Sequence, residues 1–228
     1  MSKPGGIDEL SPPAKWFRAV RRRNVAGIVA LVAALVFTLI AVDVVNKGAL
    51  TLVDADINEW LHARNSPGTT TFFLLISQLH KNLSIAIVTM AVCAYLWSKR
   101  LRSEMLTFVI AVFGGMLLNV ALKLAFARAR PHFEDPILTL RTFSFPSGHT
   151  MAATVFYGSL CVLVVSRVSN CSLRVAAILM AVLLISLVGF SRMYLGVHYL
   201  SDVMAGISEG VGWVALSVLL VGGIQNSS

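Results

Sequence analysis

The stretch 144–166, SFPSGHTMAATVFYGSLCVLVVS, places a short polar cluster directly before a long apolar run. The run from Thr150 to Ser166 contains no Asp, Glu, Lys or Arg. A helix needs about 20 mostly apolar residues to cross a bilayer, or somewhat fewer where its ends lie in the interface. The stretch therefore predicts a membrane-spanning helix that begins at a group of polar side chains.

Other apolar runs of similar length lie on both sides of this stretch. They are 24–45, 82–98, 105–122, 175–191 and 203–224. The run 82–98 is short, and we expect it to borrow length from the preceding 72–79. Apolar residues make up 57% of the 228-residue chain and charged residues 13%, whereas a soluble domain carries roughly 25% charge. The sequence predicts an all-α polytopic membrane protein with six transmembrane helices in a single domain, 1–228, and excludes a soluble globular protein.

Basic residues are unevenly distributed over the connections between these spans. With the amino terminus in the cytoplasm, 11 of the 19 Lys and Arg residues lie on the cytoplasmic side: Lys3, Lys15, Arg18, Arg21, Arg22, Arg23, Lys99, Arg100, Arg102, Arg167 and Arg174. Because basic residues mark the cytoplasmic side, we expect both termini there, with 1–23 as a cytoplasmic basic tail. The scatter of basic residues between apolar runs does not indicate nucleic-acid binding.

The segment 50–81, between the first two spans, is too polar to cross. Its apolar residues at i, i+4, i+7 and i+8 are Val53, Ile57, Trp60 and Leu61, and its charged residues at other positions are Asp54, Asp56, Glu59 and Arg64. The pattern predicts an extracytoplasmic amphipathic helix on the outer leaflet, with Trp60 as interface anchor and Ser66-Pro67-Gly68 as its end. The segment serves either as a lid for a lipid or as a surface connector, and the connector is the simpler interpretation.

Polar residues gather in three clusters at the ends of predicted spans. The clusters are Lys123, Arg128, Arg130, Pro131 and His132; then 144–149; then Ser191, Arg192, His198 and Asp202. The connections between spans three and four and between spans five and six open on the same face of the membrane. The clusters can therefore converge there, and the charge bias makes this face the extracytoplasmic one. Ionisable side chains at span ends are costly and indicate a functional site.

Three cations in these clusters predict a site for a multiply charged anion such as phosphate. Lys123 and Arg130 lie seven residues apart, or two helical turns, and can point the same way. Arg192 adds a third positive charge from a neighbouring span. Ser147 and Gly148 precede a helix start, where free backbone N–H groups and the helix dipole favour phosphate.

Two histidines add reactive groups to this anion site. If the sixth span begins near His198, then His198 and Asp202 lie at i and i+4 on one helical face, and the carboxylate can accept a ring N–H. That contact fixes the tautomer and leaves the other ring nitrogen free as a nucleophile. His149 comes from a different span and can serve as general acid for the leaving oxygen.

The three clusters have complete, ordered spacings: Lys123-x6-Arg130-Pro131, Pro146-Ser147-Gly148-His149 and Ser191-Arg192-x5-His198-x3-Asp202. They resemble the three-part signature of the type 2 phosphatidic acid phosphatase superfamily, whose helical core is shared with vanadium haloperoxidases. The resemblance covers 123–202. The six-span layout is also similar to that of bacterial members that act on phosphatidylglycerophosphate or polyprenyl diphosphate.

The resemblance implies a bacterial inner-membrane enzyme that hydrolyses a lipid phosphate or diphosphate, such as undecaprenyl diphosphate, phosphatidylglycerophosphate or phosphatidic acid. It implies that His198 forms a phosphohistidine, that Asp202 orients His198, and that His149 protonates the leaving oxygen and then activates water. The implied phosphate-binding residues are Lys123, Arg130, Ser147, Gly148 and Arg192. The implied reaction needs no metal and no other cofactor, and the implied partners are the lipid substrate and the bilayer.

Three other functions stay open. A lipid phosphotransferase would pass the phosphoryl group to another lipid, and an anion transporter would move phosphate without cleaving a bond. A metal hydrolase would use His149, His198 and Asp202 as ligands. The cysteines, Cys93, Cys161 and Cys171, show no CxxC spacing and predict neither a disulfide framework nor a thiolate metal site.

No catalytic role is predicted for the remaining polar residues in the first instance. Arg128 and Arg141 are expected to be solvated loop residues, with binding of a second phosphate or a headgroup as the alternative. The histidines without a predicted role or partner are His62, His80 and His132. Glu209 lies about three turns, or roughly 16 Å, beyond His198. It is expected to contact a polar group on a neighbouring helix or to be protonated, and a role in proton or substrate passage is a further hypothesis.

Overall fold

The computed structural model describes residues 12–225, and the side chains of residues 23–222. Every regular element within these residues is helical. In chain order they are α1 (Pro12–Asn46), α2 (Ala49–His62), α3 (Pro67–Leu79), α4 (Asn82–Ser98), α5 (Arg102–Val109), the π-helical turn η1 (Ile110–Gly114), α6 (Gly115–Phe126), α7 (Gly148–Arg167), α8 (Cys171–Tyr194) and α9 (Leu200–Gln225). Residues 1–11 of the predicted basic tail lie outside the described residues.

Within the described residues, five continuous helical stretches are long and apolar enough to cross a membrane. They are Arg23–Asn46, Arg102–Phe126, Gly148–Arg167, Cys171–Tyr194 and Leu200–Gly222. Helices α3 and α4 meet at 49° and provide a sixth span when the bent pair is taken as one. The all-α fold class is therefore confirmed, and the described helices supply five spans, or the predicted six if α3 and α4 form one.

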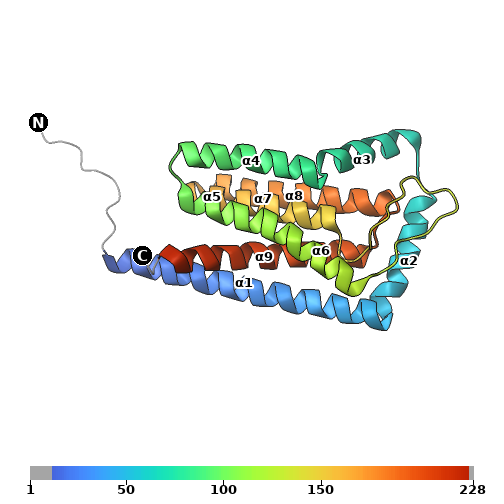
Figure 1. Cartoon of the computed structure of the whole chain (residues 1–228), viewed down its shortest axis with the longest axis horizontal. Coiled ribbons are helices and arrows are strands. Elements are labelled where there is room, and N and C mark those ends of the chain that lie inside the picture. The colour runs from blue at the N-terminus through green and yellow to red at the C-terminus, as the bar shows by residue number, and fades with distance from the viewer. Residues whose placement is uncertain (1–11, 226–228) are drawn as a thin grey trace, which may run out of the picture.

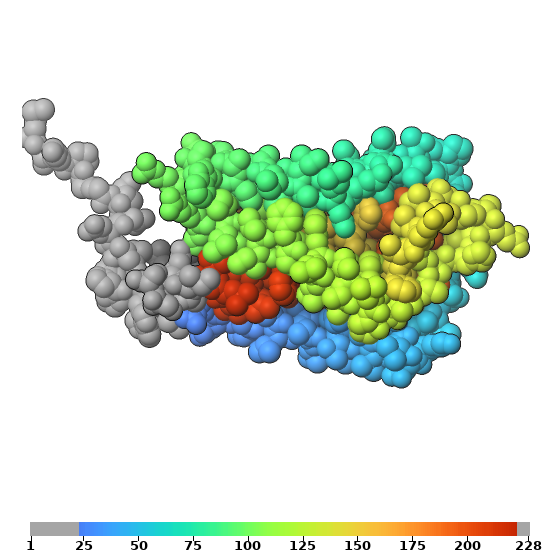
Figure 2. Space-filling model, in the orientation of Figure 1, coloured from blue at the N-terminus to red at the C-terminus, as the bar shows by residue number. Residues whose placement is uncertain are grey.

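The helices form an elongated bundle whose polar connections gather at one end (Figure 1). Helix α1 runs alongside α9, and α1 begins at the end of the bundle where α9 finishes. Helix α2 and the connection 127–147 lie at the opposite end (Figure 1). In the space-filling view this connection, coloured yellow, covers that end of the molecule (Figure 2). The two connections that carry the polar clusters thus open on the same side of the bundle.

Helix α7 lies inside the bundle and sets the position of one polar cluster. It packs against α8 and α9, and its residues Met151 and Val155 are buried. Helix α9 approaches α7 closely because it carries glycine where the two meet. A Cβ at Gly206 would lie only 2.7 Å from the Ser147 carbonyl oxygen. Small residues permit such close contacts between membrane helices, and this contact holds the start of α7 against the start of α9.

Large apolar side chains are exposed along the outer helices. The exposed fractions reach 74% for Leu31 of α1, 72% for Leu83 of α4 and 73% for Leu117 of α6. A monomeric soluble protein rarely exposes such extensive apolar surface. These side chains therefore match the hydrocarbon of a bilayer, which agrees with the span assignment.

Helix α2 forms as predicted and ends before Ser66, which caps α3, but Asp54 does not lie on the polar face expected for it. Val53 and Trp60 of the predicted apolar stripe are exposed on the protein surface, which is compatible with the predicted place on the outer leaflet, whereas Asp54 and Asn58 are buried together with Leu61. The face of α2 that packs against the rest of the protein therefore includes the carboxylate of Asp54. It can do so because a cation and a hydroxyl from other parts of the chain satisfy Asp54, as described below.

Candidate active site

His198 and Asp202 form a hydrogen-bonded pair at the start of α9. Helix α9 begins at Leu200, so that Asp202 lies in its first turn and His198 just precedes it. Oδ2 of Asp202 accepts the backbone N–H of Tyr199 at 2.9 Å and lies 3.3 Å from Nδ1 of His198. The hydroxyl of Ser144 donates to the same carboxylate oxygen. The predicted contact between the carboxylate and a ring nitrogen is present.

His198 is held as a neutral imidazole. His198 is 2% exposed, and this burial lowers its pKa to about 3, although Asp202 acts in the opposite direction. With Nδ1 donating to Asp202, Nε2 keeps its lone pair. Nη1 of Arg130 donates to Nε2 at 3.1 Å. The unprotonated nitrogen therefore points at a guanidinium group.

Lys123 and Arg130 come together over the backbone of residues 142–144. Nζ of Lys123 donates to the carbonyls of Phe143 at 2.8 Å and Ser144 at 3.1 Å. Arg130 donates to the carbonyls of Thr142 at 2.7 Å and Phe143 at 3.0 Å. These carbonyl groups fix both cations beside His198.

The predicted reason for this convergence is wrong. A single helix was expected to carry Lys123 and Arg130 two turns apart, but α6 ends at Phe126. Ala127 then adopts a left-handed conformation with φ of 46°. Arg130 consequently reaches the site from the irregular connection 127–147, and burial lowers its pKa against the opposing effect of Asp202.

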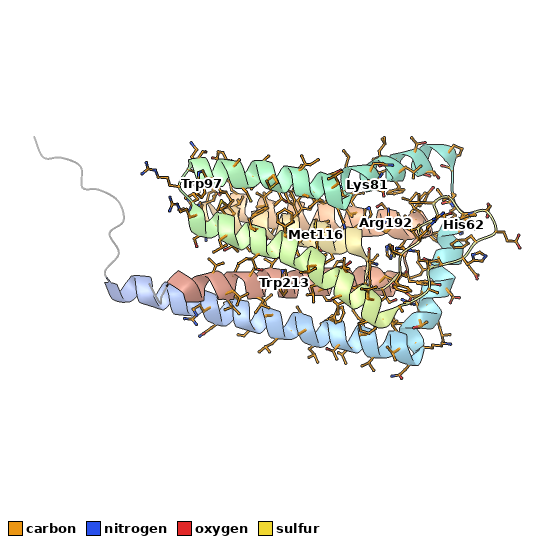
Figure 3. The ribbon with its side chains drawn as sticks, in the orientation of Figure 1. His62, Lys81, Trp97, Met116, Arg192 and Trp213 are labelled. Atoms are coloured by element: carbon orange, nitrogen blue, oxygen red, sulfur yellow. The ribbon has the colours of Figure 1, made fainter. Side chains whose placement is uncertain are left out.

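Arg192 is fully buried near the end of α8. Figure 3 shows it inside the bundle, toward the end at which His62 of α2 lies. Its Nη1 donates to the hydroxyl of Ser77 on α3, while Nε and Nη2 have no hydrogen-bond partner among the described residues. A buried cation with unpaired donors is costly, and the arrangement suits an anion that would accept these two N–H groups.

Ser147, Gly148 and His149 stand at the start of α7. Ser147 precedes the helix, its N–H donates to the Asp202 carbonyl at 2.9 Å, and its hydroxyl lies 2.9 Å from the Thr150 hydroxyl. A Cβ at Gly148 would lie 3.6 Å from Cε of Lys123, so the Lys123 stem passes this helix start. His149 is half-buried in the first turn of the same helix.

Three residues beside this group had no predicted role in it, namely Asp54, Asn119 and Ser144, and a fourth, Arg128, had one only as the alternative to a solvated position. Arg128 is half-buried and bound to Asp202 and Asp54, so its expected solvated position is wrong. Burial acts to lower the pKa of Arg128, but the two carboxylates outweigh burial and raise it. No local pattern could have found Arg128, because the sequence predicted a helix through Arg130 and the left-handed Ala127 ends that helix earlier.

Other polar residues have structural partners. Oε2 of Glu209 accepts a hydrogen bond from Asn119 at 2.8 Å, which confirms the expected contact with a neighbouring helix. Nε2 of His62 lies 2.9 Å from Asp135, and His80 lies 2.8 Å from the Tyr157 hydroxyl. His132 and Arg141 are exposed loop residues. In the described part of the chain, no three His, Cys, Asp or Glu side chains are grouped so that they could hold a metal ion.

The helical fold and the signature residues at one end of the bundle define a known class of protein. Residues 104–225 match the family model of the PAP2 superfamily, and the chain belongs to this family. It is 39% identical over 105 residues to phosphatidylglycerophosphatase B of Bacillus subtilis, covering 45% of this chain and 51% of that protein. It is 38% identical over 123 residues to lipid A 1-phosphatase of Rhizobium etli, covering 50% and 48%. The chain thus matches about half the length of these relatives.

Two solved structures share the fold. A transmembrane PAP2-type phosphatidylglycerolphosphate phosphatase from Bacillus subtilis aligns with a TM-score of 0.75 and 27% identity, over 87% of this chain and 96% of that one. LpxE of Aquifex aeolicus aligns with a TM-score of 0.53 and 22% identity, over 77% and 96%. The second likeness concerns the fold alone.

Proposed function

We propose that the protein is an integral-membrane lipid phosphatase that releases the terminal phosphate of a lipid phosphate or diphosphate through a phosphohistidine intermediate. The contact between Nη1 of Arg130 and Nε2 of His198 carries the proposal. It sets an unprotonated ring nitrogen directly beside a guanidinium that can bind a phosphate oxygen. A nucleophile and its target are thereby brought within reach before reaction.

In the proposed reaction, Nε2 of His198 attacks the terminal phosphorus and the bond from phosphorus to the leaving oxygen breaks. His149 gives that oxygen its proton. A water molecule then attacks the phosphohistidine and passes a proton to His149, the bond between phosphorus and nitrogen breaks, and inorganic phosphate leaves. Asp202 keeps Nδ1 protonated and stabilises the positive charge that the ring acquires.

In this scheme the phosphate oxygens are bound by Lys123, Arg130 and Arg192, together with Ser147 and the backbone N–H at Gly148. Phosphoryl transfer depends mostly on positioning and on stabilising negative charge. Three side-chain cations at the positive end of α7 can supply that stabilisation, so we propose that the reaction is independent of metal ions.

A lipid substrate is supported by the position of the site and by the relatives. The site lies at one end of a bundle whose outer surface is apolar, so a phosphate at the membrane surface could reach it while its tails stay in the bilayer. The relatives' names refer to phosphatidylglycerophosphate and to lipid A 1-phosphate. Phosphatidylglycerophosphate, undecaprenyl diphosphate and phosphatidic acid are the candidate substrates.

We propose that the site faces the periplasm or the cell exterior of a bacterial inner membrane, with both termini in the cytoplasm. The distribution of Lys and Arg supports this orientation. Labelling of single cysteines introduced at Arg141 and at Arg100, in a variant whose three native cysteines are replaced by serine, with a membrane-impermeant maleimide in cells tests it. The proposal expects labelling at Arg141 only, and labelling at Arg100 only would reverse it.

The activity test is phosphate release by the purified full chain from the three candidate lipids in detergent micelles, with p-nitrophenyl phosphate as a soluble control. The proposal expects release from at least one lipid, unaffected by excess chelator and lost in His198→Ala. Loss of activity in chelator would favour a metal hydrolase. Transfer of label to an acceptor lipid without phosphate release would favour a phosphotransferase, and phosphate movement across vesicles without cleavage would favour a transporter.

A further inference from the structure

A buried ion cluster joins α2 to the carboxylate that orients His198. Arg128 donates from Nη1 to Oδ1 of Asp202 at 2.8 Å and from Nη2 to Oδ2 of Asp54 at 2.9 Å. Ser201 links the same groups, because its N–H donates to Oδ1 of Asp54 at 2.8 Å and its hydroxyl contacts both Asp54 and Arg128. Asp54, Ser201 and Asp202 are fully buried. The guanidinium therefore bridges two buried carboxylates from helices far apart in the sequence.

The two oxygens of Asp202 serve different partners. Oδ2 faces Nδ1 of His198, the N–H of Tyr199 and the hydroxyl of Ser144. Oδ1 is bound by Arg128. Arg128 also lies 4.3 Å above the ring centre of Tyr199. The guanidinium thus fixes the plane of the carboxylate, and that plane decides whether Oδ2 meets the imidazole ring.

The charges of this cluster do not cancel. Two carboxylates share one guanidinium, which leaves one negative charge in a buried environment where charges interact strongly. His198 lies at the edge of the cluster, 3.3 Å from Asp202. The carboxylate of Asp202 therefore faces Nδ1 while Arg130 contacts Nε2, so the carboxylate offsets the nearby guanidinium when the imidazole ring becomes positive on bonding of Nε2 to phosphorus.

We propose that Arg128 and Asp54 are positioning residues for His198 and act through Asp202, an inference that rests on the proposed hydrolysis. Arg128 aligns the carboxylate of Asp202, and Asp54 holds Arg128 in place and supplies the second carboxylate. Helix α2 thereby contributes to the reaction although it carries none of the signature residues.

Two linked substitutions distinguish the proposed positioning role of Arg128 and Asp54 from a purely structural role of α2. In Arg128→Gln, the two buried carboxylates lose their cation and repel each other, so that one of them takes up a proton and Asp202 orients His198 poorly. A second substitution, Asp54→Asn, removes the repulsion and leaves Asp202 as the only charge. If Asp54 only held α2 in place, Asp54→Asn would lower kcat further in the Arg128→Gln variant. In the proposed role, Asp54→Asn should raise the kcat of that variant.

Leu61→Ala is the matched control for the docking of α2. Leu61 lies on the same buried face of α2 as Asp54 and packs against Tyr194, Leu195 and Val197. Its truncation loosens the helix and leaves a cavity, but it removes no charge from the cluster. A loss of turnover caused by loosening of α2 alone would appear in this variant.

The experiment measures kcat and KM for phosphate release by the full chain in detergent, with the lipid that the wild-type protein hydrolyses best. We expect Arg128→Gln to lower kcat about 10- to 100-fold, by analogy with the removal of groups that orient metal-binding histidines. We expect KM to stay within about twofold, because Arg128 is assigned no contact with substrate. The variant that combines Arg128→Gln with Asp54→Asn should have a kcat about tenfold higher than that of Arg128→Gln alone. Leu61→Ala should keep kcat within about threefold of the wild-type value.

Several results would overturn the inference. They are an unchanged kcat in Arg128→Gln, a rise in KM alone, a double variant less active than Arg128→Gln, or an equal loss in Leu61→Ala. If Arg128→Gln does not fold, Asp54→Asn alone decides, since the proposal expects a lower kcat at constant KM. A wild-type protein that releases no phosphate from any lipid overturns the proposed function as well, which separates the two failures.

Discussion

Replacement of Arg192 by Met should weaken catalysis and stabilise the protein at the same time. The guanidinium is buried, and its Nε and Nη2 have no hydrogen-bond partner in the part of the chain that the structure describes. In the proposed complex both groups donate to phosphate. A hydrogen bond to a charged group contributes about 1.5–3 kcal/mol, so the two together contribute about 3–6 kcal/mol. The variant should therefore lose about 10²- to 10⁴-fold in kcat/KM.

The stability of the phosphate-free protein should change in the other direction. Each unsatisfied buried donor costs about 1–3 kcal/mol. Met removes the charge and both donors while filling similar space, and the lost hydrogen bond to Ser77 returns about 1 kcal/mol of the gain. We expect the free energy of unfolding to rise by about 1–5 kcal/mol, in line with other replacements of buried ions by apolar side chains.

The assay pairs phosphate release with thermal unfolding in detergent, with and without inorganic phosphate. Phosphate should raise the melting temperature of the wild-type protein and have little effect on Arg192→Met. Arg167→Met is the control, because Arg167 lies at the other end of α7 and pairs with Glu104. The reasoning is refuted if Arg192→Met keeps its kcat/KM, or if it is less stable than wild type without phosphate.

Three further predictions concern pH, a buried amide and a helix contact. The folded pKa of His198, about 3, lies below its ordinary 6.5. The unfolded chain therefore binds the proton first, and stability should fall as pH is lowered from 6.5 toward 3; His198→Asn should flatten this dependence in thermal melts. Asn119→Ala leaves both oxygens of Glu209 unpaired and should cost about 1–3 kcal/mol of unfolding free energy, measured in denaturant. Gly206→Ala forces a Cβ against the Ser147 carbonyl and should cost about 1–3 kcal/mol, with a parallel loss of kcat that Gly222→Ala, where a Cβ would have open space, should not share.

The spans could be predicted from the sequence because each depends on local composition. A run such as 24–45 must be helical and must face lipid, whatever its neighbours are. The common face of the polar clusters follows from the alternation of spans, which requires no knowledge of packing. The bent pair α3 and α4 could also be anticipated, since the second run is too short to cross alone.

The details of the site depended on long-range partners that periodicity does not reveal. Asp54 belongs to the polar side of α2 by pattern, yet it is buried because Arg128, 74 residues later, neutralises it. The end of α6 at Phe126 depends on the left-handed Ala127, a residue type that carries no stop signal. Both errors concern places where tertiary contacts override local preference.

The central claim is that Nε2 of His198 becomes covalently bonded to phosphorus, and trapping of the intermediate tests it most directly. Purified protein is mixed with ³²P-labelled lipid phosphate, quenched within milliseconds and digested for peptide mapping. We expect a label that is stable in alkali, labile in acid and confined to the peptide that contains His198, with none in His198→Ala. Turnover in His198→Ala at the wild-type rate, or a label on another residue, would contradict it.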